Sequence, residues 1–98
     1  MASQRFADLP RRLVGDREVP IAVGACARTL GMSFLDRADA GPGLLIPHCA
    51  AVHTFGMRFA LDVFFLAEDD EVLGVRRAVP PCRFVAHRGA VAVLEVPA

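Results

Sequence analysis

Residues 58–79 decide the fold, and they read RFALDVFFLAEDDEVLGVRRAV. In the first half, apolar residues stand at alternate positions, which is typical of a strand that buries one face. The acidic cluster Glu68–Asp70 then separates this run from a second apolar run. The pattern predicts two neighbouring antiparallel strands, Arg58–Ala67 and Glu71–Val79, joined by a three-residue hairpin loop.

The alternation extends back to residue 53 and predicts which side chains share a face. The odd positions are expected on the core face: His53, Phe55, Met57, Phe59, Leu61, Val63 and Phe65. A three-residue loop sets Phe65 opposite Leu73 and requires a left-handed backbone at Asp70. The same register sets Asp62 opposite Arg76. We therefore predict a cross-strand ion pair between these two residues on the polar face.

The flanking sequence continues the strand pattern toward both ends. Further strands are predicted at Gly43–Ile46, Ala50–Phe55, Arg83–Ala86 and Ala90–Val96. Apolar residues near helical spacing predict one helix over Ile21–Arg37, and residues 1–20 are expected to form a loosely ordered arm or a short strand. The expected fold is therefore a single α+β domain over residues 1–98. It is mainly β, with an antiparallel sheet curled into a small barrel or sandwich and one flanking helix.

Composition narrows the classes of partner. The 11 Lys and Arg residues balance the 11 Asp and Glu residues, so we expect no nucleic-acid partner and no membrane partner. The three cysteines, Cys26, Cys49 and Cys82, are too few for a disulfide framework and are expected to be reduced. The sequence contains no apolar run of membrane length and opens on mixed charge, which favours a cytoplasmic location.

Several blocks of the sequence resemble one uncharacterised protein family. They are His53–Leu66, the acidic turn after it, Val79–Pro81, Val93–Ala98, and the upstream segment Arg28–Met32. Together they resemble the bacterial "domain of unknown function 192" family. The resemblance implies a compact β-rich fold with a flanking helix, and it implies no activity.

The chain also departs from that family in two places. Residues 53–57, His-Thr-Phe-Gly-Met, replace a Trp-Met-Lys-Asn-Thr segment found in many members, and Ala60 replaces a proline. A site built on that aromatic and amide is therefore not expected. The closing Gly-Asp segment of the family has no counterpart after Ala98. We expect that its absence leaves a sheet edge open to a second copy of the chain, giving a homodimer.

The preferred candidate site is a polar patch on the central strand. It comprises Arg58, Asp62, Arg76 and Glu95, in which acids stand within apolar runs. Such a patch is typical of a non-catalytic module that binds a small ligand or a protein partner. The same acids, Asp62 and Glu95, would serve acid–base chemistry in a small enzyme. A purely structural ion pair is the third interpretation.

Imidazole and thiol groups give two further candidates. A zinc or copper site would use His48, Cys49 and His53 as ligands, with Cys82 or His87 as a further ligand. Adjacent residues such as His48 and Cys49 point to opposite faces of a strand, which weakens this interpretation. A cysteine nucleophile, Cys49 or Cys82, would need His53 or His87 close in space as its base. No cofactor is predicted, and the sequence leaves open whether the protein is an enzyme.

Overall fold

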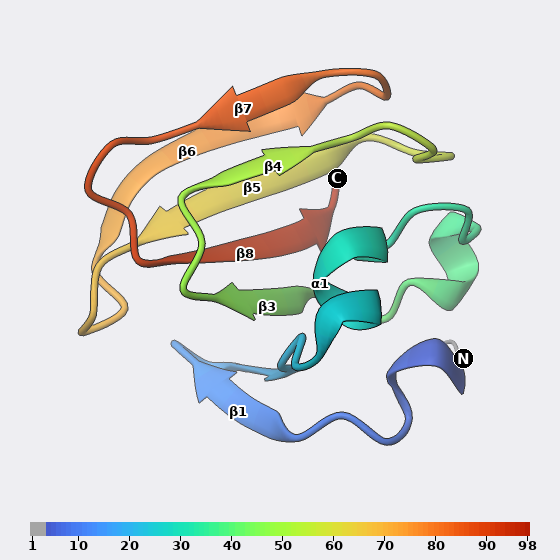
Figure 1. The fold of residues 1–98 in the computed structure, drawn as a ribbon, viewed down its shortest axis with the longest axis horizontal. Helices are drawn as coiled ribbons and strands as arrows, with labels where there is room; N and C mark the ends of the chain where they lie inside the picture. Colours follow the sequence, from blue (N-terminus) through green and yellow to red (C-terminus); the bar gives the residue numbers. More distant parts are fainter. Residues whose placement is uncertain (1–3) are drawn as a thin grey trace.

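The fold is mainly β. The computed structural model describes residues 4–98, apart from the side chains of Gln4, Ala25, Cys26 and Thr29 (Figure 1). The elements, in chain order, are the 3-10 helix η1 (Gln4–Phe6), β1 (Arg11–Val14), β2 (Arg17–Pro20), α1 (Ala25–Leu30), the 3-10 helix η2 (Arg37–Asp39), β3 (Leu44–Pro47), β4 (Ala51–His53), β5 (Leu61–Leu66), β6 (Val72–Val79), β7 (Phe84–Ala86) and β8 (Ala92–Pro97).

The main sheet has four antiparallel strands in the order β3-β8-β5-β6. The last strand, β8, therefore lies between two strands that precede it in the chain. Two further antiparallel pairs, β1–β2 and β4–β7, complete the strands. The predicted antiparallel, mainly β class is thus confirmed. Over residues 4–98 the strands form three sheets and no closed barrel, whereas the prediction was one sheet curled into a small barrel or sandwich.

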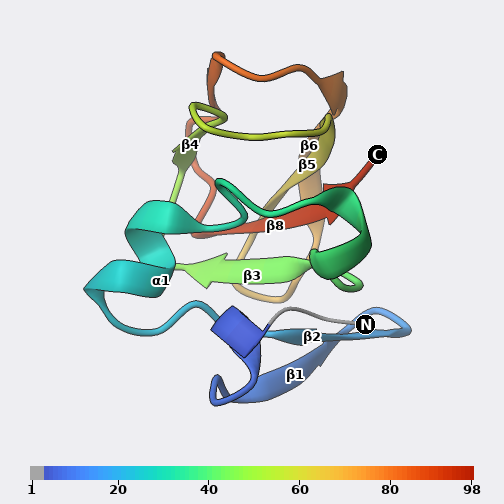
Figure 2. The same ribbon diagram turned by 90° about the vertical axis from the view of Figure 1, so that its right-hand side faces the viewer.

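Two apolar clusters lie on opposite faces of the main sheet. The β4–β7 pair faces β5 and β6 across the larger cluster (Figures 1 and 2), where Val52 and Val85 pack with Val63 and Phe65. On the other face, Val14 and Val19 of the β1–β2 hairpin join a smaller cluster that contains Leu66 and Leu94. Neighbouring residues of β5 and β8 therefore face different environments, which decides where each acid lies.

The predicted helix over Ile21–Arg37 is much shorter than expected. Only Ala25–Leu30 is helical, and glycines with positive φ stand at both ends, 85° at Gly24 and 51° at Gly31. A left-handed glycine is a common end to a helix because it has no Cβ to clash with the backbone. The apolar spacing continued past Gly31, but the backbone does not. None of the helices in the described part is long and apolar enough to cross a membrane.

The amino-terminal arm is better ordered than predicted. Residues 11–20 form the β1–β2 hairpin, in which Arg11 is opposite Pro20 and Val14 is opposite Arg17. Gly15, with a φ of 64°, provides the left-handed turn that the hairpin needs. Residues 1–3, the start of the predicted arm, lie outside the described residues.

The central hairpin β5–β6 is confirmed, including the left-handed Asp70, which has a φ of 67°. Its register differs from the prediction, because Phe65 is opposite Gly74 rather than Leu73. Irregular pairing near both ends of β5 shifts the partners by one residue.

The first strand of this hairpin also starts later than predicted, at Leu61. Residues 54–60 turn instead, with a φ of 79° at Gly56, so His53 and Phe55 are exposed rather than part of the core face. Met57 is buried as expected.

Candidate functional site

The four residues of the predicted polar patch do not lie together. Asp62 is opposite Val96, whereas the neighbouring Val63 is opposite Glu95. Because adjacent strand residues point to opposite faces, Asp62 and Glu95 lie on opposite sides of the sheet. Arg58 lies before β5 and forms an exposed ion pair with Asp36 at 3.1 Å.

Asp62 pairs with Arg77, not with Arg76 as predicted. Its Oδ2 accepts a hydrogen bond from Arg77 Nη1 at 3.2 Å, and its Oδ1 accepts one from the backbone N–H of Ala78 at 2.8 Å. Ala78 has a φ of 49° and lies within the shifted part of the strand pairing, between Arg76 and Val79. Asp62 therefore holds an irregular stretch of β6 in place, while Arg76 is opposite Val63.

A shallow groove of about 300 Å³ lies on the Asp62 side of the sheet. Phe64, Leu66 and Leu94 line it, and the Arg77 guanidinium stands 5.3 Å from the centre of the Phe64 ring. Both oxygens of Asp62 already accept hydrogen bonds within the protein. Each oxygen of Asp62 thus has a partner within the protein, unlike an orphaned buried carboxyl oxygen, although each keeps a second lone pair.

Glu95 is in a different situation. It lies in β8 between Leu44 of β3 and Val63 of β5, and it is only 3% exposed. Within the described part of the chain, its Oε1 is buried without a hydrogen-bond partner. Burial removes the carboxylate from water and raises the pKa of Glu95 from 4.5 to about 7. The group therefore exchanges its proton near neutral pH and has an unused polar atom.

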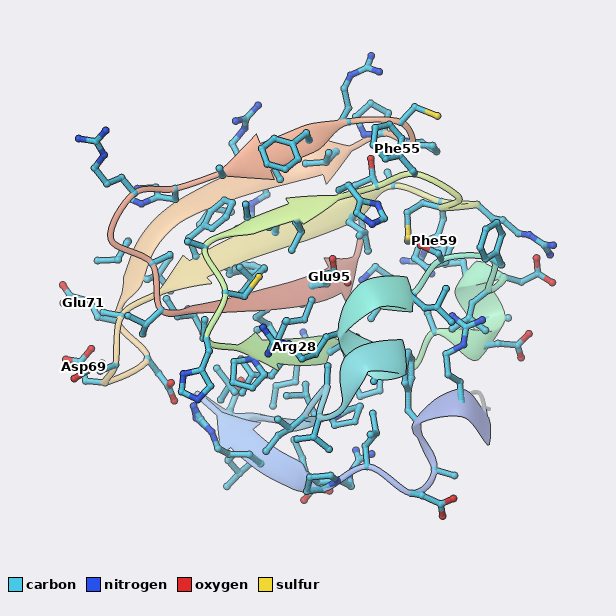
Figure 3. The ribbon with its side chains drawn as sticks, in the orientation of Figure 1. Arg28, Phe55, Phe59, Asp69, Glu71 and Glu95 are labelled. Carbon is cyan, nitrogen blue, oxygen red and sulfur yellow. The ribbon has the colours of Figure 1, made fainter. Side chains whose placement is uncertain are left out.

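Glu95 lines a pocket of about 210 Å³ beside helix α1 (Figure 3). Met32, Ile46, Val52 and Met57 supply apolar walls. Arg28 on α1 and His53 at the end of β4 also line the pocket, and both are exposed. The pocket thus has a buried carboxyl at its base and cationic or imidazole N–H groups at its rim.

Other polar groups of the pocket are occupied by local hydrogen bonds. Ser33 Oγ donates to the carbonyl of Phe55 at 3.0 Å, and the Cys49 thiol donates to the carbonyl of Ala51 at 3.0 Å. His53 Nδ1 accepts the backbone N–H of Phe55 at 3.2 Å. In the neutral ring, the proton of His53 is therefore on Nε2.

The predicted metal and nucleophile sites are not assembled. Among the described residues, no three His, Cys, Asp or Glu side chains gather to hold a metal ion. Cys49 and His53 both line the pocket, but they are not bonded to each other: the Cys49 thiol donates to the Ala51 carbonyl, and His53 Nδ1 accepts the Phe55 N–H. His48 is exposed, with a φ of 53°.

Cys82 and His87 lie away from the pocket. Cys82 is exposed. The His87 ring lies against Gly74 and stands 5.6 Å from the Phe65 ring. In residues 4–98, neither described thiol is hydrogen-bonded to an imidazole; Cys49 is bonded to Ala51, and the side chain of Cys26 lies outside the described residues.

The sequence predicted Glu95, Cys49 and His53 as candidate residues but assigned them to different sites. Arg28 was named only as part of the segment Arg28–Met32 that resembles the family. That segment supplies Arg28, Gly31 and Met32 to the pocket. The resemblance was therefore a signal that this segment is more than a surface helix.

Comparison with known protein families identifies the chain's relatives. The family model DUF192, described as Uncharacterized ACR, matches residues 11–98. The chain belongs to this family. The matched DUF192 region runs from β1 through β8 and contains every residue named for the pocket. DUF192 is an uncharacterised family, so membership brings no activity with it.

Two solved structures share the fold of this DUF192 chain. A protein of unknown function from Novosphingobium aromaticivorans is 14% identical, with a TM-score of 0.63 over 99% of this chain and 87% of that one. A protein described as a candidate transcription regulator from Sinorhizobium meliloti is 20% identical, with a TM-score of 0.66 over 90% of this chain and 78% of that one. Among the curated proteins, none matches significantly.

Proposed function

We propose that this DUF192 chain is a binding module for a small ligand, and that the ligand donates a hydrogen bond to Glu95 in the pocket beside α1. The observation that carries the proposal is the Oε1 atom of Glu95, which is buried and has no partner in the described part of the chain. A polar atom buried in this way destabilises a protein by about 1–3 kcal/mol. A ligand with an N–H or O–H donor would recover that loss on binding.

The shape and composition of the pocket support a small ligand rather than a protein partner. The pocket, at about 210 Å³, is smaller than the usual range of roughly 300–1,000 Å³ for drug-sized ligands. Its walls are apolar and its polar groups are few, which is the usual composition of a small-molecule site. The proposed ligand therefore has a short apolar body and one inner hydrogen-bond donor.

A second candidate function uses the same carboxyl as a general acid or base. It is favoured by the raised pKa of Glu95, about 7, because acid–base catalysts work best with a pKa near the working pH. In this alternative the bound molecule is converted, and Glu95 moves its proton. Following a bound compound by NMR over hours separates the two, since a binding module returns it unchanged.

Arg58, Asp62 and Arg76 remain predicted contacts for a second ligand or a partner, as separate positions and not as one patch. A homodimer through an open edge also stays a prediction, and β6 is the candidate edge because it pairs only with β5. The twisted, bulged pairing of β6 and its arginines would make a weak dimer. Light scattering after gel filtration tests this, and a monomer at all concentrations would contradict it.

We also propose a cytoplasmic location and a ligand class that excludes nucleic acid and lipid. Cys49 and Cys82 are free thiols, which supports a reducing cytoplasm. The balanced charge supports a ligand that is neither nucleic acid nor membrane lipid. The likeness to a candidate transcription regulator, at 20% identity, supports the fold and adds nothing to the function.

The test measures melting temperature with probes that differ only in the donor they carry. Butylamine, butanol and butyramide present an N–H or O–H group on the same apolar body, and butyrate at pH 8 presents none. We expect at least one donor probe to raise the melting temperature of the wild type and butyrate to have no effect. Glu95→Met removes both oxygens at similar length and should abolish the shift.

Glu18→Met is the matched control, because Glu18 is an exposed acid on β2, away from the pocket. It should respond to the probes as the wild type does. If no donor probe gives a shift that depends on Glu95, the proposed function is wrong.

A further inference from the structure

The polar groups of the Glu95 pocket are arranged with opposite hydrogen-bonding character at its two ends. The base carries an acceptor, Glu95 Oε1, with no partner in the described part of the chain. The exposed rim carries donors, on Arg28 and His53. A ligand that satisfies both ends needs a donor at its inner end and an acceptor or anion at its outer end.

We propose that the ligand is a small zwitterion, an amino acid whose ammonium group binds Glu95 and whose carboxylate binds Arg28 and His53 at the rim. This inference rests on the proposed function and names the class of its ligand. The ammonium group would meet the one acid that lines the pocket among the described residues. The carboxylate would meet the one arginine that lines it in the same part of the chain.

Arg28 is held in position but still has donors to offer. Its Nη1 donates to the carbonyl of Pro47, and its Nη2 donates to the carbonyl of His48 at 3.2 Å. A guanidinium group has five N–H donors, so these two bonds leave others unused. The two carbonyls fix the guanidinium at the end of β3 (Figure 3), where a planar carboxylate can accept from the remaining N–H groups.

His53 supplies a second rim donor. Because its Nδ1 accepts the Phe55 N–H, the neutral ring carries its hydrogen on Nε2, which is the ring atom able to donate. The ring also stacks on Phe55, with centroids 5.3 Å apart, which restrains its orientation. His53 on β4 thus adds a donor to a pocket that Arg28 lines from α1.

The segment between the two ends must be apolar. Ser33 and Cys49 both donate to backbone carbonyls and offer no hydrogen to a ligand in this conformation. The remaining wall is apolar and consists of Leu30, Gly31, Met32, Ile46, Ala51, Val52 and Met57. Methylene groups match such a wall, so a linear ω-amino acid is the simplest compound with the required order of groups.

Linear ω-aminoalkanoic acids can also measure the distance between the acceptor and donor ends of the pocket. The series from glycine to 6-aminohexanoate moves the carboxylate away from the ammonium group one methylene at a time. Isothermal titration at pH 7.5 should give one preferred chain length. At that length, the amine that lacks the carboxylate should bind at least about ten-fold more weakly, since a charge-assisted hydrogen bond is lost. The alkanoate that lacks the amine should not bind measurably.

Two variants assign the two ends. Arg28→Met should bring the affinity for the amino acid down toward that for the plain amine, with His53 keeping the remainder, and Glu95→Met should abolish binding of both. Arg17→Met is the matched control, because Arg17 also donates to a backbone carbonyl, that of Pro42, but lies outside this pocket. Circular dichroism of each variant checks the fold, and the comparison between wild-type ligands stands even if Arg28→Met unfolds.

The outcomes distinguish the zwitterionic ligand from the proposed binding function. Equal affinity of the wild type for the amine and the amino acid at every length would overturn the zwitterion and leave the binding function intact. Binding that survives Glu95→Met would overturn both. A preferred length that depends on Arg28 supports both.

Discussion

Gly31 lies directly against the carboxyl of Glu95, so that a Cβ at position 31 would come 3.2 Å from Oε1. Both residues line the pocket, so Gly31 forms the part of its wall next to the acid. The contact links the end of α1 to the middle of the main sheet, and it makes position 31 sensitive to any side chain.

Gly31→Ala should therefore reduce both stability and ligand binding. The φ of 51° at this position strains any residue with a Cβ by roughly 1–2 kcal/mol. Gly15→Ala is the matched control, because Gly15 has a φ of 64° but no atom within 4 Å of the added Cβ. Urea unfolding should show a larger loss for Gly31→Ala than for Gly15→Ala. Equal losses would mean that the contact with Glu95 has no effect.

The stability of the protein should depend on pH through Glu95. Its pKa is about 7 in the folded protein and 4.5 in the unfolded reference, because burial disfavours the charged form. Between these values the folded state holds a proton that the unfolded state has lost. The contribution of Glu95 to the free energy of unfolding is thus greatest below pH 4.5, falls as the pH rises, and levels off above pH 7. The total change is about 3 kcal/mol.

The Glu95→Gln variant measures that contribution by difference. Its free energy of unfolding, from urea titrations at pH 5, 6, 7 and 8, should lack the decline that the wild type shows. Glu18→Gln should keep it, because Glu18 is exposed. Parallel pH curves for wild type and Glu95→Gln would mean that the buried carboxyl does not titrate in this range.

Asp62 should stabilise the fold mainly through the backbone of β6. Asp62→Ala removes the acceptor for the Ala78 N–H, 2.8 Å away, and for Arg77, 3.2 Å away. We expect a loss of about 1–3 kcal/mol. Arg77→Met should lose less than about 1 kcal/mol, because Arg77 is exposed. Chemical denaturation measures the loss for these two variants and for Arg76→Met, for which we expect a loss near zero. A larger effect of Arg76→Met than of Arg77→Met would contradict the observed pairing.

Thr54 should be among the most sensitive polar residues of the chain. It is fully buried, and its hydroxyl donates to the carbonyl of Pro80 at 2.7 Å and accepts the N–H of Arg83 at 2.8 Å. Thr54→Val keeps the shape and leaves both backbone groups without these bonds. We expect a loss of about 2–4 kcal/mol in thermal or urea unfolding. Ser33→Ala, which removes one bond to the carbonyl of Phe55, should lose less.

Local sequence pattern predicted the parts of the fold that depend on neighbouring residues. The β5–β6 hairpin and the left-handed Asp70 follow from alternation and a short acidic loop. The helix prediction failed because the apolar spacing continues past Gly31, whereas the positive φ of Gly31 ends the helix. The register failed by one residue because the pairing shifts between Phe65 and Leu66, and it shifts again between Leu61 and Val63, where Asp62 binds the Ala78 N–H. That contact exists only once the two strands have met.

The site was harder to predict because its residues come together through long-range pairing. Glu95 and Asp62 are both acids within apolar strands, and nothing local distinguishes them. Their different environments result from β8, which lies between β3 and β5 and turns Glu95 toward the pocket. Arg28 reaches that pocket from α1. It is too far from Glu95 in the sequence for helix or strand periodicity to relate the two residues.

The central place of β8 also constrains how the protein forms during translation. Both strands that flank it, β3 and β5, leave the ribosome earlier. Their edges toward β8 stay unpaired until β8 emerges, since they pair with β8 and not with each other. Until then their apolar edges are exposed to chaperones and to other nascent chains. The acid of the pocket arrives on this same late strand. The newborn chain therefore acquires its main sheet and the base of its pocket in one step.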